Sequence, residues 1–253
     1  MTPPSYDALV LAGGRARRLG GVSKPDVVVG GRRLLAHVLG AVDGPDVRRV
    51  VVVGPDTLAV PDGVTRTLED PPDGGPVAGL AAGLAILRDG AEPEWVLVLA
   101  CDVPRVAGAV PLLVGAVDAV VDAAGPGGTG SSSRACDGVV LVDDDGRDQP
   151  LVGLYRRVAL DAAVARLGAG GGAGAGRDGV RGASVRALVD ALDLVRVADV
   201  EHHGVDVDTW ADVAALEAKG PAASTTTRGT MTGQADARPG LMSEARPDAG
   251  GEA

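Results

Sequence analysis

The chain alternates between short apolar runs and longer segments in which apolar residues recur at helical spacing. Residues 8–12 and 95–100 are apolar runs of strand length, residues 47–53 form a Val-rich run, and Gly13 and Gly14 follow the first of them. Residues 34–42 and 77–87 carry apolar positions at helical spacing. Apolar runs of about four to eight residues bounded by turn signals are typical of buried strands, whereas longer periodic segments favour helices. The pattern therefore predicts β-α-β-α order.

The second part of the chain departs from this alternation. Residues 138–142 and 150–155 predict two consecutive strands around an Asp-rich turn, and residues 168–182 form a glycine-rich insertion. The remaining elements are expected to be helices at residues 110–123, 158–167, 185–191 and 211–216 and a strand at residues 195–198. Thr209 or Asp208 is expected to cap the last helix.

The C-terminal stretch differs in composition from the rest. Residues 221–253 are rich in Thr, Gly, Ala, Pro and charged residues and show no apolar period. Such a segment buries too little apolar surface to offset its conformational entropy. We therefore expect one folded domain over residues 1–219 and a disordered tail over residues 220–253.

Composition narrows the fold class. The chain has 253 residues, 45% of them hydrophobic, but only 2% aromatic and no Phe. Its core must therefore consist mainly of Val, Leu and Ala, which suit parallel strands and closely packed helices. A single α/β domain is expected.

The net charge and the length of the apolar runs restrict which ligands and surfaces the protein can bind. A formal net charge of -10 without a compensating basic stripe argues against nucleic acid as a ligand. A phosphate-bearing small molecule would have to be held by placed amides, a lysine and a divalent cation. The apolar runs are too short for a membrane helix, which favours a cytoplasmic protein that does not contact membranes. Cys101 and Cys136 lack the spacing of a zinc or disulfide motif.

The segment from Leu11 to Lys24 follows the first predicted strand and is a candidate phosphate-binding loop. Gly13 and Gly14 would let backbone amides approach a ligand closely. Arg18 and Lys24 could neutralise a polyphosphate. Neither the P-loop pattern nor the dinucleotide-binding Gly-x-Gly-x-x-Gly pattern is present, which disfavours ATPase and dehydrogenase functions.

Asp102 is the second candidate. It directly follows the apolar run 95–100, and Pro104 then stops the strand. Ligands of open α/β sheets bind beyond the carboxyl ends of the strands. A carboxylate placed there is a candidate functional group.

These motifs together resemble those of the molybdenum cofactor guanylyltransferases, in the MobA-like NTP transferase family. The loop matches the signature Leu-Ala-Gly-Gly-x-x-x-Arg-Met/Leu-Gly followed by Lys. Further matches occur in family order at Glu69-Asp70, residues 75–79, residues 102–104, residues 147–150 and residues 206–209. The resemblance covers approximately residues 6–218.

The resemblance implies a fold and a reaction. The fold would be a single-domain, three-layer α/β/α arrangement of the nucleotide-diphospho-sugar-transferase type, Rossmann-like, with a mostly parallel central sheet. The reaction would be Mg²⁺-dependent transfer of GMP from GTP to molybdopterin, with release of pyrophosphate. Contact with molybdenum-insertion proteins or molybdoenzyme chaperones would follow from the same role.

The resemblance also implies roles for individual residues. Lys24 and Asp102 would be catalytic, with Asp102 also the Mg²⁺ ligand, and Asp206 and Asp208 would lie near the acceptor. Nucleotide-binding residues would be Leu11, Ala12, Gly13, Gly14, Arg18, Lys24, Asp70, Gly75 and Gly79. Within the family, glycine at the position of Gly13 goes with guanine and alanine with cytosine.

Three positions depart from the family pattern. Ser23 stands where an acid usually precedes the lysine, and Asp206 and Asp208 replace asparagines. The two aspartates add negative charge that a cation or an arginine must offset.

Two alternatives stay open at this point. One keeps the fold and changes the substrates, to cytidylyl transfer onto molybdopterin or nucleotidyl transfer onto a sugar or alditol phosphate. The other is a non-catalytic nucleotide-binding protein in which Asp206 and Asp208 mark lost chemistry.

Overall fold

The structure is a computed structural model that describes residues 3–13, 15–16, 19–88, 93–124, 136–169 and 177–218. All of these lie in one compact unit, Met1–Pro221. A second unit, Ala222–Ala253, lies wholly outside the described residues, as does the predicted tail from residue 220.

A seven-stranded sheet forms the centre of the first unit, in the order β11-β9-β10-β8-β1-β6-β7. Its strands are β1 (Tyr6–Leu11), β6 (Val47–Val53), β7 (Val64–Thr67), β8 (Trp95–Ala100), β9 (Gly138–Val142), β10 (Asp148–Arg156) and β11 (Leu194–Ala198). Every neighbouring pair is parallel except the two that involve β10. The predicted mostly parallel sheet and the antiparallel pair β9–β10 are both confirmed.

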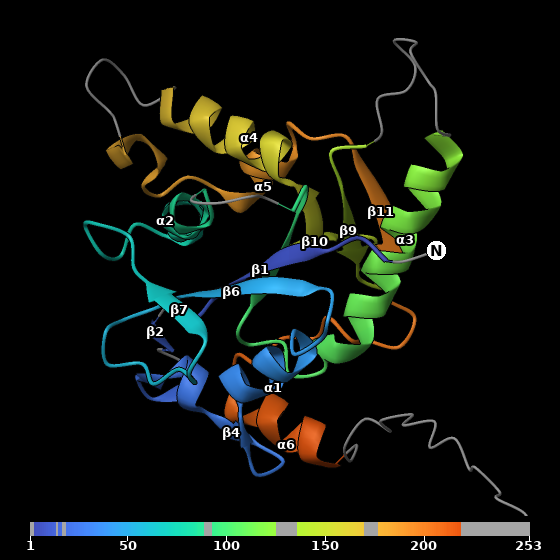
Figure 1. Cartoon of the computed structure of the whole chain (residues 1–253). Coiled ribbons are helices and arrows are strands. Elements are labelled where there is room, and N and C mark those ends of the chain that lie inside the picture. Colours follow the sequence, from blue (N-terminus) through green and yellow to red (C-terminus); the bar gives the residue numbers. More distant parts are fainter. Residues whose placement is uncertain are drawn as a thin grey trace, which may run out of the picture. The chain divides into compact units, whose positions relative to one another are not determined.

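Helices cover both faces of the sheet, which confirms the three-layer α/β/α arrangement (Figure 1). The helices are α1 (Leu34–Ala41), α2 (Pro76–Leu87), α3 (Ala109–Ala124), α4 (Arg157–Ala169), α5 (Val185–Val189) and α6 (Trp210–Ala218). The α1 and α3 helices pack with Ala8 and Val10 on one face. The α2, α4 and α5 helices pack with Leu9 on the opposite face. Successive residues of β1 thus serve opposite layers, as the pleat requires.

Short elements lie between β1 and α1. β2 (Arg15–Ala16) pairs with β3 (Val22–Ser23), a 3₁₀ helix η2 covers Lys24–Asp26, and β4 (Val28–Val29) pairs with β5 (Arg32–Arg33). A third apolar cluster joins this region to the C-terminal part of the unit through Leu19, Val27, Val29, Leu34, Val207 and Val213. Residues 19–34 and residues 207–213, which are far apart in the sequence, are thereby held together.

The glycine-rich insertion is described only at its two ends. The α4 helix continues to Ala169, beyond the predicted end at residue 167, and a 3₁₀ helix η4 covers Arg177–Val180. Residues 170–176 lie outside the described part of the chain.

The α2 helix approaches the sheet closely through its glycines. A Cβ atom added at Gly83 would lie 2.3 Å from Leu9 Cδ1 and 3.1 Å from Val53 Cγ2. One added at Gly79 would lie 3.4 Å from Leu11 Cδ2. Helix α2 is thus seated against β1 and β6 by residues without side chains.

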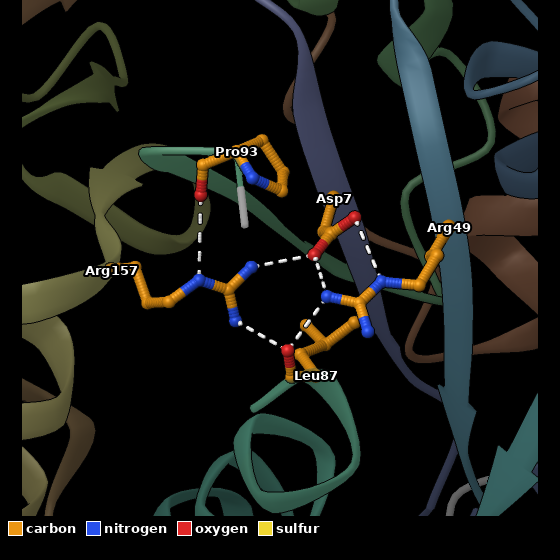
Figure 2. Close-up of polar contacts among 5 residues, drawn as sticks. All are labelled: Asp7, Arg49, Leu87, Pro93 and Arg157. Carbon is orange, nitrogen blue, oxygen red and sulfur yellow. Dashed lines mark hydrogen bonds and ion pairs between the residues drawn. The ribbon is translucent and has the colours of Figure 1, made fainter. Parts of the chain in front are cut away.

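A buried ionic cluster ties the amino end of β1 to three other elements (Figure 2). Asp7 is fully buried, and its Oδ2 lies 2.5 Å from Arg157 Nη2 and 2.7 Å from Arg49 Nη2. Both guanidinium groups also donate to the carbonyl oxygen of Leu87 at the end of α2, at 3.2 and 2.6 Å. Arg157 donates further to the carbonyl oxygen of Pro93 at 3.4 Å. The cluster satisfies the charges that the sheet encloses.

Among the described residues, no helix is long and apolar enough to cross a membrane.

Candidate active site

Backbone hydrogen bonds align the carboxyl ends of four neighbouring strands. The amide of Cys101 donates to the carbonyl of Leu11 at 3.0 Å, and the amide of Ala12 donates to that of Val53 at 2.8 Å. The amide of Gly54 donates to the carbonyl of Thr67 at 2.8 Å. The loops after β8, β1, β6 and β7 therefore leave the sheet along one edge. That edge is where open α/β sheets bind ligands.

Strand β8 delivers Asp102 to this edge. Ala100 pairs with Leu11 at the end of the parallel β1–β8 ladder, so Asp102 lies beside the loop that begins at Ala12. The carbonyl oxygen of Asp102 accepts a hydrogen bond from the amide of Val207 at 2.9 Å. This bond brings the segment after β11 to the same place.

Lys24 reaches Asp102 from the loop after β1. It begins η2, whose second residue, Pro25, is buried and whose next neighbour, Val27, belongs to the third apolar cluster. Lys24 Nζ lies 2.6 Å from Asp102 Oδ2 and 2.5 Å from Asp208 Oδ1. The side chain of Lys24 is 14% exposed, so it is largely withdrawn from water. The ammonium thus bridges two carboxylates, Asp102 and Asp208, that are far apart in the sequence.

A third carboxylate completes the cluster. Asp102, Asp206 and Asp208 each offer an oxygen atom, and these atoms lie within 4.8 Å of one another. Three carboxylates and one ammonium leave the group with net negative charge when all are ionised. Partial desolvation, and then the negative charges of Asp102 and Asp208, raise the pKa of Asp206, although Lys24 opposes the shift. Among Lys24 and these three aspartates, negative charge therefore exceeds positive charge.

The two aspartates also change the pKa of Lys24. Burial by itself would lower the pKa, but the hydrogen bonds to Asp102 and Asp208 and the charges of those two groups outweigh it, and the pKa is raised. Lys24 is accordingly held in its charged form at neutral pH.

The first turn of α6 fixes the backbone of Asp208. Asp212 Oδ2 accepts hydrogen bonds from the amide of Asp208 at 3.0 Å and from the amide of Thr209 at 2.7 Å. The hydroxyl of Thr209 also donates to this oxygen at 2.9 Å, and it accepts from the amide of Asp212 at 3.3 Å. This reciprocal arrangement is a capping box, and it confirms Thr209 as the capping residue.

The oxygen ligands present suit a hard divalent cation. Mg²⁺ is usually bound by one or two carboxylates together with the phosphates of a substrate. The cluster offers three carboxylates, and a cation, the ammonium of Lys24, already lies between two of them. Asp102, Asp206 and Asp208 thus fit a magnesium ion in chemistry and in charge.

A second feature lies three strands away along the same edge, after β7. A groove of about 640 Å³ is lined by residues that include Glu69, Asp70, Ala78 and Arg181. Three strand spacings correspond to about 14 Å. The lining continues along α2 to Arg88 and along α4 to Ala169, so the groove meets this edge only at residues 67–71, after β7.

The loop between β7 and α2 is held by contacts from two directions. Glu69 Oε1 accepts from the amide of Gly74 at 3.3 Å, and Arg181 Nη1 donates to the carbonyl oxygen of Pro71 at 2.7 Å. Gly182 donates its amide to the carbonyl of Gly74 at 2.8 Å. The C-terminal end of the glycine-rich insertion thereby fixes the start of α2.

The predicted site residues fall into three sets. Lys24, Asp102, Asp206 and Asp208 meet in one cluster, with Leu11, Ala12 and Gly13 in the adjoining strand end and loop. Asp70 lines the groove, and Gly75 stands at the N-cap of α2 with φ 89°. Gly14 and Arg18 lie outside the described residues.

Gly79 has a packing role in the structure. Its amide donates to the carbonyl of Gly75 at 3.1 Å within α2, and its α-carbon faces Leu11 and Val53. Nucleotide binding by Gly79 stays a prediction.

Three residues that position the site were given no role from the sequence. Asp212 could have been found, because Thr209-x-x-Asp212 fits the pattern of a capping box. Glu69 adjoins Asp70, but its bond to Gly74 depends on the loop geometry. Arg181 contacts residues more than a hundred positions earlier, and no local pattern indicates this.

Comparison with known proteins adds sequence relatives. The family model described as MobA-like NTP transferase domain matches residues 8–185. Molybdenum cofactor guanylyltransferase of Pseudomonas putida (strain GB-1) is 37% identical over 114 residues, which are 41% of this chain and 53% of the relative. The protein of the same name from Rhodopseudomonas palustris (strain HaA2) is 35% identical over 105 residues, 40% of this chain and 49% of the relative. The chain spans about half the length of the curated relatives it matches.

Solved structures share the fold at low sequence identity. Molybdopterin-guanine dinucleotide biosynthesis protein A from Archaeoglobus fulgidus has a TM-score of 0.57 and 20% identity, covering 85% of this chain and 98% of that one. 2-C-methyl-D-erythritol 4-phosphate cytidylyltransferase from Francisella tularensis has a TM-score of 0.58 and 13% identity, covering 83% and 98%. Asp206 and Asp208 lie beyond the residues that the family model matches.

Proposed function

The chain belongs to the MobA-like NTP transferase family, and from this premise we propose that it is a nucleotidyltransferase that transfers GMP from GTP to molybdopterin and releases pyrophosphate. The observation that carries the proposal is the contact of Lys24 with Asp102 and Asp208 beside the loop that begins at Ala12. The names of the curated relatives support the same reaction.

The reaction forms one bond and breaks one. A phosphate oxygen of the acceptor attacks the α-phosphorus of the nucleotide, and the bond from the α-phosphorus to the bridging oxygen breaks. Pyrophosphate leaves with the electron pair of that bond. A phosphate monoester with a second pKa of about 6 is largely ionised at neutral pH, so the attack needs no general base. Catalysis then depends on positioning and on stabilisation of negative charge.

The residues of the cluster supply these two effects. Lys24 neutralises phosphate oxygens, and the amide of Gly13 lies beside the nucleotide. Asp102 would hold a magnesium ion, with Asp206 and Asp208 within reach of the same ion. When bound, the ion supplies charge stabilisation to the phosphates.

The nucleoside would lie towards the groove after β7. Asp70 lines this groove, and Gly75 begins α2 next to it. Among the described residues, no side chain caps the amino end of α2, and Pro76 at its first position has no N–H, so the amides of Val77 and Ala78 would be the donors to an anionic or polar ligand group. The preference for guanine rests on Gly13 through the family resemblance and on the relatives' names.

A nucleotide panel tests the proposal. GTP, CTP, ATP and UTP would each be incubated with Mg²⁺ and either molybdopterin or 2-C-methyl-D-erythritol 4-phosphate, with release of pyrophosphate and product mass as readouts. Expected are pyrophosphate release and a guanine dinucleotide product with GTP and molybdopterin alone. The Asp102→Ala variant serves as the inactive control.

Two results would overturn it. Pyrophosphate release with CTP in preference to GTP would reassign the nucleotide. No release with any nucleotide and either acceptor, by a protein that is folded by circular dichroism, would favour a non-catalytic nucleotide-binding protein.

A further inference from the structure

We propose that Asp208 is a positioning residue for Lys24, which it holds, in the nucleotide-free protein, in the place that the divalent cation takes. The cation and the nucleotide phosphates would then enter the site together. This inference rests on the proposed nucleotidyl transfer at the same site.

The ammonium of Lys24 lies between the carboxylates that a divalent cation would bind. Lys24 Nζ lies 2.6 Å from an oxygen of Asp102 and 2.5 Å from an oxygen of Asp208. Both aspartates belong to the set whose oxygens approach one another within 4.8 Å. A magnesium ion binds its oxygens at about 2.0–2.1 Å. An ion that took these two oxygens would therefore be in direct repulsion with the ammonium.

Asp208 gives the chain this property. The family pattern has asparagine at this position, and an amide oxygen can accept a hydrogen bond from lysine without balancing its charge. The aspartate adds a full negative charge opposite Asp102, so the ammonium is bracketed from two sides. Hydrogen bonds fix the backbone of both aspartates. The amide of Val207 donates to the carbonyl oxygen of Asp102, and the amide of Asp208 donates to Asp212 Oδ2.

A purely structural ion pair is the simpler alternative. The side chain of Asp208 is 45% exposed, however, and partly exposed pairs contribute little to stability. The pair also lies at the ligand-binding edge of the sheet and not in the core. These observations favour a role in ligand binding.

The arrangement couples the two ligands. When phosphate oxygens draw Lys24 away, the carboxylates lose their competitor for the cation. When a divalent cation occupies the carboxylates, Lys24 is released towards the phosphates. By linkage, each ligand raises the affinity of the other by the same factor.

Metal binding without nucleotide gives the first test. Mn²⁺ would be titrated into the nucleotide-free protein and followed by electron paramagnetic resonance. The Lys24→Met variant should bind Mn²⁺ about tenfold more tightly than the parent, a factor within the usual range of coupling between sites. Arg196→Met is the matched control, because it removes one positive charge from an exposed pair with Asp148 and should leave the affinity unchanged. Unchanged or weaker binding by a folded Lys24→Met variant would overturn the proposal.

The sequence makes a second, direct test possible. Lys24 and Lys219 are the only lysines of the chain, so protein labelled with ¹³C-lysine gives two sets of lysine NMR signals. Adding Mg²⁺ without nucleotide should move the Lys24 signals and leave those of Lys219 in place. Asp208→Asn should move the Lys24 signals towards free lysine before Mg²⁺ is added, and Asp208→Glu should restore them. Lys24 signals that do not respond to Asp208→Asn would show that Asp208 does not position the lysine.

Failure of this proposal and failure of the proposed function are separable. The metal titration and the lysine signals need no substrate, whereas the nucleotide panel reports the transfer reaction. A protein that transfers GMP but binds Mn²⁺ equally with and without the Lys24 ammonium would refute only the inference drawn here.

Discussion

Thr209 and Asp212 exchange hydrogen bonds across the first turn of α6. The Thr209 hydroxyl and amide donate to Asp212 Oδ2 at 2.9 and 2.7 Å, and the amide of Asp212 donates to the Thr209 hydroxyl at 3.3 Å. The same carboxylate oxygen holds the amide of Asp208. A local capping interaction therefore also orients Asp208, one of the three carboxylates of the cluster.

Asp212 should make stability depend on pH in a defined direction. The hydrogen bond from the Thr209 side chain, and then those from the amides of Asp208 and Thr209, lower the pKa of Asp212 in the folded protein. A carboxylate with a lowered folded pKa stabilises the fold above its unfolded pKa, and the stabilisation is lost as the pH falls through the folded pKa. Asp212→Asn should therefore lower the free energy of unfolding at pH 7 by about 0.3–1 kcal/mol. The Tm should fall with it. The difference should shrink towards zero below about pH 4.

Thermal melts of both proteins between pH 3 and 7 measure this. Asp118→Asn, in the middle of α3 and away from either helix end, is the control and should show no such trend. A Tm difference that stays constant over the whole range would rule out the ionised carboxylate as the cause.

Asp102→Ala should abolish nucleotidyl transfer and leave the fold intact. Loss of one electrostatic stabiliser of the transition state lowers rates by about a hundredfold or more. The fold should persist because Lys24 keeps its contact with Asp208, and the carbonyl of residue 102 still accepts from Val207.

Activity with GTP, together with circular dichroism and thermal melting, checks both parts. Asp26→Ala is the matched control, since Asp26 is close in sequence to Lys24 but pairs with Arg33. Parental activity in a folded Asp102→Ala variant would disprove the active-site assignment.

Local pattern was sufficient to predict most of the sheet and the helices. Residues 47–53 and 95–100 form strands with the predicted bounds, because short runs rich in Val and Leu are strong signals of strands. β7 was missed because Val64–Thr67 has four residues, only one of them apolar, and lies half-exposed at the sheet edge. The short hairpins before α1 were also missed, since two-residue strands carry no periodicity.

The site could be predicted in its parts but not in its pairing. Motif resemblance singled out Lys24, Asp102 and Asp208, yet assigned Asp208 to the acceptor and did not relate it to Lys24. Their contact joins residues 184 positions apart and depends on the third apolar cluster and on the bond from Val207 to Asp102. Such long-range contacts leave no periodic signal in one sequence.

Asp7→Ala should destabilise the protein strongly without a direct effect on catalysis. Asp7 is fully buried between Arg157 and Arg49, and removing it takes away the carboxylate that both guanidinium groups contact (Figure 2). Breaking a buried pair in this way costs about 3–5 kcal/mol. Asp7 precedes the active-site end of β1 by four residues, about 13 Å, so kcat should be retained below the melting temperature.

Denaturant unfolding of this variant and of Asp161→Ala makes the comparison. Asp161 pairs with Arg88 at 2.7 Å, but Arg88 is 54% exposed, so the loss there should be about 0–1 kcal/mol. Equal losses for the two variants would mean that burial does not determine the effect at Asp7.

Gly83→Ala and Gly115→Ala should change stability in opposite directions. Alanine is favoured over glycine in a helix by up to about 1 kcal/mol. At Gly83 the added Cβ would lie 2.3 Å from Cδ1 and 2.9 Å from Cγ of Leu9, which is fully buried and has no room to move. Overpacking of this kind costs about 1–3 kcal/mol and should outweigh the helix preference. At Gly115 the added Cβ meets nothing within 4 Å, so the Tm should rise. A rise in Tm for both variants would contradict the close seating of α2.

Gly13→Ala should weaken the use of GTP and narrow the preference for GTP over CTP while leaving the stability unchanged. A Cβ at Gly13 meets no described residue within 4 Å, and Gly13 has no positive φ, so the described part of the chain accommodates alanine. Replacing glycine in such a place changes stability by at most about 1 kcal/mol, through the unfolded chain. A bound nucleotide would approach the loop closely, and there the methyl group would meet the ligand.

The measurement is kcat/KM for GTP and for CTP, with thermal melting of the same samples. Gly44→Ala is the matched control, because its Cβ also meets nothing within 4 Å and it lies before the amino end of β6, away from the carboxyl ends that carry the site. Both variants should melt close to the parent, and only Gly13→Ala should lose selectivity. Neither variant should change the stability, because neither added Cβ contacts a described residue. A loss of selectivity confined to Gly13→Ala would therefore be attributable to a contact with the nucleotide. An unchanged ratio of the two kcat/KM values would remove Gly13 from the guanine assignment.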